Sequence, residues 1–115
     1  MARILVAEDD TAVKSFVSRA LSHRCHKVTS VDDGVQALEA LDRDAFDLLI
    51  TDIVMPRMDG YELVRKLRQD ESMSGTPVIF CSATYHEREV REMARSLGVR
   101  STLSKPYDLE VVRET

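Results

Sequence analysis

The sequence has no tryptophan, only 2 cysteines and no long run of apolar residues. No segment approaches the ~20 apolar residues of a membrane-spanning helix, and the N-terminal MARILVAEDD turns acidic too early for a secretory signal. We therefore expect a cytoplasmic protein without a membrane partner. Cys25 and Cys81 lie far apart without a CxxC motif, which is typical of reduced thiols, and we expect both to be packing residues.

An excess of basic charge is also missing, since 16 Lys and Arg stand against 20 Asp and Glu. Proteins that bind nucleic acid usually carry a basic stripe, so we expect no direct contact with DNA or RNA. The chain has 115 residues, of which 43% are hydrophobic, and this is enough for one ordinary domain with a sizeable core. The expectation is a single domain over residues 1–115.

Short apolar runs alternate along the chain with segments of helical periodicity. Residues 4–7, 48–50 and 78–81 are continuously apolar, as in strands that are buried on both faces, and we expect them at the centre of a sheet. Residues 27–31 and 100–104 mix apolar and polar side chains, which favours edge strands. The alternation of strands and helices predicts a parallel sheet covered by helices.

Between these runs, apolar residues recur at the spacing of helices that lay one stripe on a sheet. The expected stripes of the four helices are Val13, Phe16, Val17, Ala20 and Leu21; Val35, Leu38 and Leu41; Val64 and Leu67; and Val90, Met93, Ala94 and Leu97. The fourth helix is expected over about residues 86–97 with Gly98 as its C-cap. A fifth begins near Asp108 and has room for only about two turns, which suggests a trimmed chain or the leading domain of a longer one.

Five such strand and helix units predict a doubly wound, flavodoxin-like sheet of order 2-1-3-4-5 with a short last helix. The strand order reverses between the first and third strands. Ligands of these folds lie outside the carboxyl ends of the strands at that reversal, so the residues at those ends determine the function.

Carboxylates stand at the ends of two central strands: Glu8 and Asp9 follow the first, and Asp52 follows the third. Carboxylates a few ångströms apart repel one another unless a cation joins them. An all-oxygen set favours Mg²⁺, with Mn²⁺ as a substitute, whereas the His and Cys ligands of zinc are absent from these ends. Ser82 and Lys105, at the ends of the fourth and fifth strands, complete a phosphoryl-transfer site in which Asp52 is the expected nucleophile.

Four separated motifs, ILVAEDD, LLITDIVMPRMDG, VIFCSAT and LSKP, closely resemble those of the receiver domains of two-component response regulators, the CheY-like superfamily. The resemblance covers essentially the whole chain. It implies that Asp52 accepts a phosphoryl group from a histidine kinase or phosphotransfer protein. It also implies that Glu8, Asp9, Asp52 and the backbone carbonyl of Val54 bind Mg²⁺.

The same resemblance implies that Ser82 is the switch hydroxyl, that the backbone N–H of Ala83 approaches the phosphoryl group, and that Lys105 pairs with it. Asp10 lies one position beyond the acidic pair and is expected to begin the first helix. One position departs from the family pattern, because Thr102 stands where receivers usually carry an aromatic residue or histidine. This departure puts the usual coupling between the switch hydroxyl and that ring in doubt.

Phosphorylation is then expected to shift the surface built by the fourth helix, fifth strand and fifth helix, which would bind a partner, a second copy or an appended output domain. Three other functions stay open. A Mg²⁺-dependent phosphohydrolase is disfavoured because no DxD follows the third strand. A flavin- or nucleotide-binding module is disfavoured because AEDDTA would repel phosphate. A degenerate receiver that acts only through protein contacts is kept open by Thr102.

Overall fold

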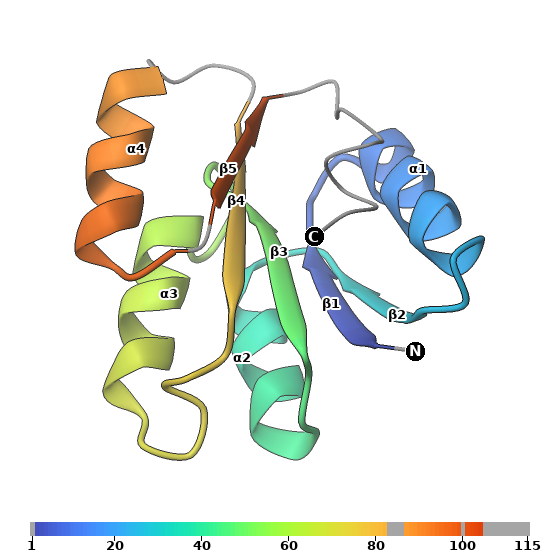
Figure 1. The fold of residues 1–115 in the computed structure, drawn as a ribbon, viewed down its shortest axis with the longest axis horizontal. Helices are drawn as coiled ribbons and strands as arrows, with labels where there is room; N and C mark the ends of the chain where they lie inside the picture. The colour runs from blue at the N-terminus through green and yellow to red at the C-terminus, as the bar shows by residue number, and fades with distance from the viewer. Residues whose placement is uncertain (1, 83–86, 100, 105–115) are drawn as a thin grey trace.

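The computed structural model describes residues 2–82, 87–99 and 101–104, with side chains described for residues 2–81 and 88–99. Within these ranges, five strands form one parallel sheet of order β2-β1-β3-β4-β5, accompanied by four helices (Figure 1). The elements are β1 (Arg3–Ala7), α1 (Thr11–Ser22), β2 (Lys27–Val31), α2 (Gly34–Arg43), β3 (Leu48–Asp52), α3 (Gly60–Gln69), β4 (Val78–Ser82), α4 (Glu87–Ser96) and β5 (Ser101–Ser104). The predicted strand order is confirmed, and the predicted fifth helix lies outside the described residues.

Each face of the sheet carries its own apolar core. Leu5 and Ala7 of β1 pack with α2, α3 and α4, whereas Ile4 and Val6 pack with α1, because successive residues of a strand point to opposite faces. Figure 1 shows α1 on one side of the sheet and α3 and α4 on the other. All of β3 is buried, as predicted for a central strand, and it ends in Asp52.

The stripe predicted for α1 includes one residue that does not face the sheet. Val17 and Leu21 are fully buried, but the side chain of Phe16 is 45% exposed. At 3.6 residues per turn, Phe16 lies at the margin of the stripe centred near Val17, so the helix turns it away from the sheet. The prediction that Phe16 packs on the sheet is therefore wrong.

The remaining stripes largely follow the predictions. In α2 the most buried residues are Ala37, Ala40 and Leu41, whereas Val35 and Leu38 are only half-buried. Small alanines let the helix approach the sheet closely, and apolar spacing alone does not reveal this. The predictions for α3 and α4 are confirmed, because every residue predicted to face the sheet is buried or half-buried. These residues are Val64, Leu67, Val90, Met93, Ala94 and Leu97.

The two cysteines have different environments. Cys81 is buried in β4, as predicted, but Cys25 is exposed, so its assignment as a packing residue is wrong. Cys25 has φ +63° in the turn after α1, and the turn directs its side chain outward. His23 nearby is exposed, whereas His26 is half-buried and its Nδ1 accepts a hydrogen bond from the backbone N–H of Ala2 at 3.1 Å.

A single arginine ties α3 to the end of α4. The guanidinium of Arg68 donates to four backbone carbonyls, at distances of 2.6–3.0 Å: Leu97, Gly98, Ser74 and Thr76. Gly98 ends α4 at φ +66°, which confirms the predicted C-cap. The charge of Arg68 thus lies at the negative end of the α4 dipole while it also closes the loop between α3 and β4.

We expect Arg68→Met to lower the free energy of unfolding by about 2 kcal/mol, because hydrogen bonds from a charged donor contribute more than neutral ones. The control is Arg65→Met on the same helix, where Arg65 pairs with Glu62 at the surface and a change within about 0.5 kcal/mol is expected. Urea denaturation followed by circular dichroism measures both. Equal losses in the two variants would contradict the role assigned to Arg68.

Candidate functional site

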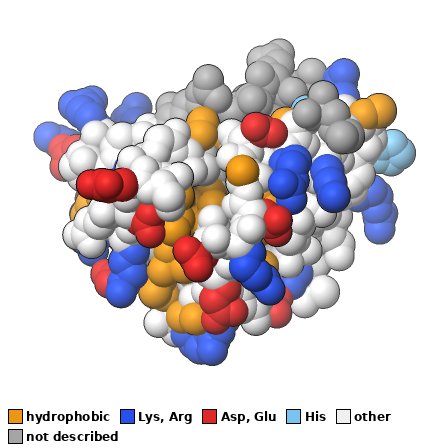
Figure 2. Space-filling model, turned by 90° about the horizontal axis from the view of Figure 1, so that it is seen from below, with side chains coloured by type: hydrophobic (Ala, Val, Ile, Leu, Met, Phe, Trp, Pro, Cys, Tyr) orange, Lys and Arg blue, Asp and Glu red, His pale blue; other side chains and the backbone are white. Residues whose placement is uncertain are grey.

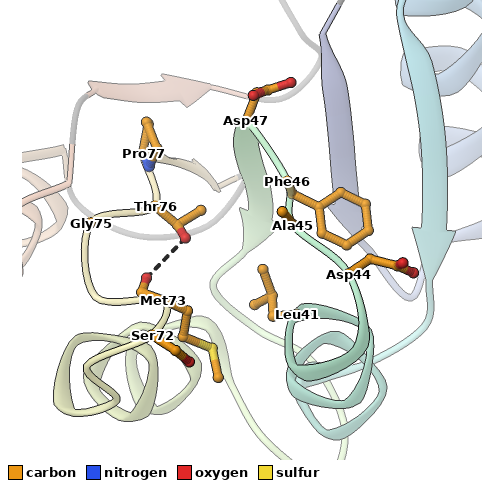
Figure 3. A pocket seen from close by; sticks show the side chains of 10 residues that line it. All are labelled: Leu41, Asp44, Ala45, Phe46, Asp47, Ser72, Met73, Gly75, Thr76 and Pro77. Carbon is orange, nitrogen blue, oxygen red and sulfur yellow. Dashed lines mark hydrogen bonds between the residues drawn. The ribbon is translucent and has the colours of Figure 1, made fainter.

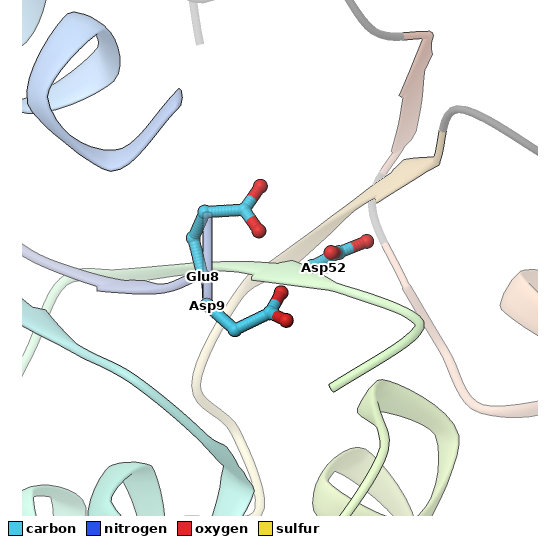
Figure 4. A group of neighbouring side chains, drawn as sticks. All are labelled: Glu8, Asp9 and Asp52. Carbon is cyan, nitrogen blue, oxygen red and sulfur yellow. The ribbon is translucent and has the colours of Figure 1, made fainter. Parts of the chain in front are cut away.

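The carboxyl ends of β1 and β3 bring three acidic side chains together. The register pairs Ala7 with Thr51, so the next residues, Glu8 and Asp52, are neighbours across the strands. Glu8, Asp9 and Asp52 each offer an oxygen atom, and these atoms all lie within 4.8 Å of one another. Figure 4 shows the carboxylates of Glu8 and Asp9 on the side of the chain that faces Asp52.

The three carboxylates differ in burial and in local support. Glu8 is fully buried and Asp52 is 7% exposed, whereas Asp9 is exposed. Oε2 of Glu8 accepts a hydrogen bond from the N–H of Asp10 at 3.3 Å, and Oδ1 of Asp52 accepts one from the N–H of Ile53 at 2.8 Å. These bonds orient the two buried carboxylates. An oxygen-only donor set that opens to solvent at Asp9 fits Mg²⁺ or Mn²⁺, and within the described part of the chain no His or Cys joins the cluster.

Asp10 does not belong to the cluster. Its Oδ1 accepts hydrogen bonds from the N–H groups of Ala12 and Val13, so Asp10 is the N-cap of α1. The prediction that Asp10 begins the first helix is confirmed. Of three consecutive acidic residues, only Glu8 and Asp9 face the carboxylate of Asp52.

Of the other predicted site residues, the backbone of Ser82 lies at the same edge of the sheet. Asp52 pairs in register with Cys81, so Ser82, the next residue, ends β4 beside the end of β3. The side chain of Ser82, together with Ala83 and Lys105, lies outside the described residues. Val54 follows β3 in the loop to α3, and its side chain is 52% exposed.

Thr102 lies in β5, in register with Phe80 of β4, which places its backbone in the edge strand. Its side chain is outside the described part of the chain. The consequence of having threonine at this position, in place of the usual aromatic residue or histidine, therefore stays a prediction from the sequence.

Gly60 positions Asp52, a role that the spacing of motifs did not reveal. A Cβ at Gly60 would collide with the carbonyl oxygen of Asp52 and would lie 3.0 Å from Cα of Ile53. Its N–H donates to the carbonyl of Ile53 at 2.7 Å. The signal in the sequence is the pair Asp59-Gly60, in which Asp59 is the N-cap of α3 and the following glycine allows close approach to β3.

A hollow of about 460 Å³ lies away from this cluster, at the amino-terminal ends of the strands. It is lined by residues of the loops before β3 and β4, and Figure 3 shows Phe46 and Met73 on opposite sides of it. Figure 2 views this end of the molecule and shows a band of hydrophobic side chains with acidic and basic side chains on its borders. The carboxylates of the acidic cluster do not line the hollow, so it is separate from the site.

A parallel sheet of this order, with three carboxylates where the strand order reverses, defines a flavodoxin-like receiver fold. The family model of the response regulator receiver domain matches residues 4–115, and the chain belongs to this family. Its class is therefore two-component signalling rather than small-molecule catalysis. Among the described helices, none is long and apolar enough to cross a membrane.

Relatives show this domain in larger proteins. The chain is 40% identical over 110 residues to the sensor protein EvgS of Escherichia coli K12, covering 96% of this chain and 9% of EvgS. It is 38% identical over 108 residues to the response regulator MprA of Mycobacterium leprae, covering 94% of this chain and 46% of MprA. It therefore spans a tenth to a half of these relatives.

A solved structure of similar fold is the receiver domain of the sensor histidine kinase PA1611 from Pseudomonas aeruginosa PAO1. Its sequence is 27% identical, the TM-score is 0.88, and the match covers 98% of this chain and 92% of that one. That structure has a magnesium ion coordinated in the active site cleft.

We expect Gly60→Ala to lower the free energy of unfolding by about 2–3 kcal/mol, because the backbone of Asp52 leaves no space for a methyl group. The matched control is Gly75→Ala, since a Cβ at Gly75 meets no atom within 4 Å. That control should change stability by less than about 0.5 kcal/mol. Urea denaturation of both variants tests the assignment, and a tolerated Gly60→Ala would contradict it.

Proposed function

We propose that this domain is a phosphoacceptor switch in which Asp52 receives a phosphoryl group from the phosphohistidine of a histidine kinase or phosphotransfer protein. The observation that carries the proposal is the acidic cluster of Glu8, Asp9 and Asp52 at the reversal of strand order. Asp52 stands at the end of a strand whose five residues are all buried, and its Oδ1 is oriented by the N–H of Ile53. A carboxylate so placed is held ready for attack on phosphorus.

The cation that we propose for the cluster is Mg²⁺, with Mn²⁺ as a substitute. Glu8, Asp9, Asp52 and the backbone carbonyl of Val54 would hold it. When bound, the cation offsets the repulsion between the carboxylates and the incoming phosphoryl oxygens. The magnesium ion of the PA1611 receiver domain supports this proposal by similarity.

In the proposed reaction, a carboxylate oxygen of Asp52 forms a bond to phosphorus, and the P–N bond of the donor's phosphohistidine breaks. The electron pair of that bond remains on the imidazole nitrogen, and the product is an aspartyl phosphate. The hydroxyl of Ser82, the N–H of Ala83 and the amine of Lys105 are proposed to bind the phosphoryl oxygens. The end of β4 beside Asp52 supports the placement of Ser82.

The proposed output is a population shift of the surface formed by α4, β5 and the helix expected after Asp108. This surface would contact a partner, a second copy or an appended output domain. We propose that residues 1–115 form one domain that acts in the cytoplasm. Relatives that are much longer than this chain support an arrangement in which the receiver is one part of a larger protein.

Incubation with acetyl phosphate tests the central step. Intact-protein mass spectrometry should show the gain of one phosphoryl group with Mg²⁺, and none with EDTA or in Asp52→Asn. Asp59→Asn is the matched control, because asparagine also caps a helix and the variant should still be phosphorylated. A wild-type chain that gains no phosphoryl group in any arm would contradict the proposal and favour the degenerate receiver.

Two neighbouring aspartates test the cation site. We expect Asp9→Asn to weaken Mg²⁺ binding by about 10-fold or more, because it removes a charged oxygen from the cluster. Asp10→Asn makes the same chemical change one residue later but preserves the N-cap of α1, and we expect a change of about threefold or less. Isothermal titration calorimetry measures both affinities. Equal effects would show that only net charge matters.

A further inference from the structure

The loop between β3 and α3 contains a strained turn centred on Arg57. Arg57 has φ +66°, a region that side chains other than glycine rarely occupy. The N–H of Met58 donates to the carbonyl of Pro56 at 2.7 Å, which closes a three-residue turn around Arg57. Such a conformation persists only where the surrounding structure holds it.

Arg57 binds a buried carboxylate on another element. Its Nε donates to Oδ2 of Asp33 at 2.9 Å, and its NH2 group donates to Oδ1 at 3.2 Å. Asp33 is the N-cap of α2 and is 5% exposed, and its Oδ1 also accepts from the N–H of Gln36 at 2.8 Å. The hydrogen bond from Arg57 holds the pKa of the Asp33 carboxyl below its ordinary value, so the pair is charged at neutral pH.

The backbone of the same loop lies against the first residue of α2. A Cβ at Gly34 would lie 2.7 Å from the carbonyl oxygen of Met58 and 2.8 Å from its Cβ. Glycine is therefore required at this point, since any larger residue would push Met58 away. Two adjacent residues therefore attach the middle of the loop to the start of α2. Arg57 does so through the ion pair, and Met58 does so through this close contact.

We propose that the pair of Arg57 and Asp33 is a latch that fixes the loop between β3 and α3 for cation binding, and that Arg57 is a positioning residue. This inference rests on the proposed function, in which the backbone carbonyl of Val54 serves the cation. Val54 lies between Asp52, which β3 fixes, and Arg57, which the latch fixes. Without the latch, the strained turn relaxes and the loop samples other conformations.

The sign of one substitution separates the latch from a simple charge effect. Arg57→Gln removes a positive charge near an acidic cluster, so Coulomb interactions alone would strengthen Mg²⁺ binding. The latch predicts the opposite, a dissociation constant raised about 3- to 30-fold, as for groups that orient metal ligands. Isothermal titration calorimetry with MgCl₂ measures this without reference to phosphorylation. A constant that is unchanged or lower would overturn the latch.

Further variants make the result independent of folding and of capping. Arg57→Gly removes the side chain and also relieves the backbone strain, so a weaker affinity in a variant at least as stable as the wild type points to the latch. Asp33→Asn keeps an N-cap but loses the charge. When it is combined with Arg57→Gln, we expect little further loss of Mg²⁺ affinity beyond that of Arg57→Gln alone. Arg65→Gln, an exposed arginine on α3, is the charge control and should not weaken binding.

The outcomes also separate the two proposals. A wild-type chain that does not bind Mg²⁺ would overturn the proposed cation site and the latch together. A wild-type chain that binds Mg²⁺ and gains a phosphoryl group on Asp52, with Arg57 variants of equal affinity, would overturn the latch alone.

Discussion

The packed cores on the two faces of the sheet hold like charges together in a place with little solvent. Glu8 is fully buried and Asp52 nearly so, and their side chains repel each other at the edge of the sheet. They stay close because β1 and β3 pair in a fixed register. The side chains of both strands are buried in two cores, one on each face of the sheet, and their packing sets this register. A slip of one residue would move each side chain into the core on the opposite face, where its size would not match its neighbours, so close packing keeps the carboxylates together.

Contacts around the cluster are arranged so that the loop after Asp52 has little freedom. Gly60 ties the start of α3 to Ile53, and the N–H of Ile53 also donates to the carbonyl of Cys81 at 3.2 Å. The middle of the loop contacts the start of α2 through Arg57, which has a positive φ and pairs with Asp33. Strain beside a site that is proposed to present several oxygens to one cation is consistent with preorganisation, because the cost of ordering is met on folding rather than on binding.

The sequence alone was sufficient for the strand order, for the grouping of Glu8, Asp9 and Asp52, and for the separate role of Asp10, because these follow from burial patterns and capping. It did not reveal the exposure of Phe16, since a residue at the margin of a stripe has the same spacing as one inside it. Nor did it reveal the pairing of Arg57 with Asp33, because 24 residues separate them. That contact depends on how α2 and the loop after β3 meet in space, which no local pattern records.

The cluster also links folding to cation binding. Glu8 and Asp52 come together only in the folded chain, so a cation that binds this cluster and not the unfolded chain would stabilise the folded form. In the proposed reaction, a phosphoryl group on Asp52 would add negative charge to this cluster. The proposed cation binding, phosphorylation and loop positioning would therefore act on one electrostatic balance, and Arg57 would affect that balance through the loop backbone without contacting the phosphoryl group.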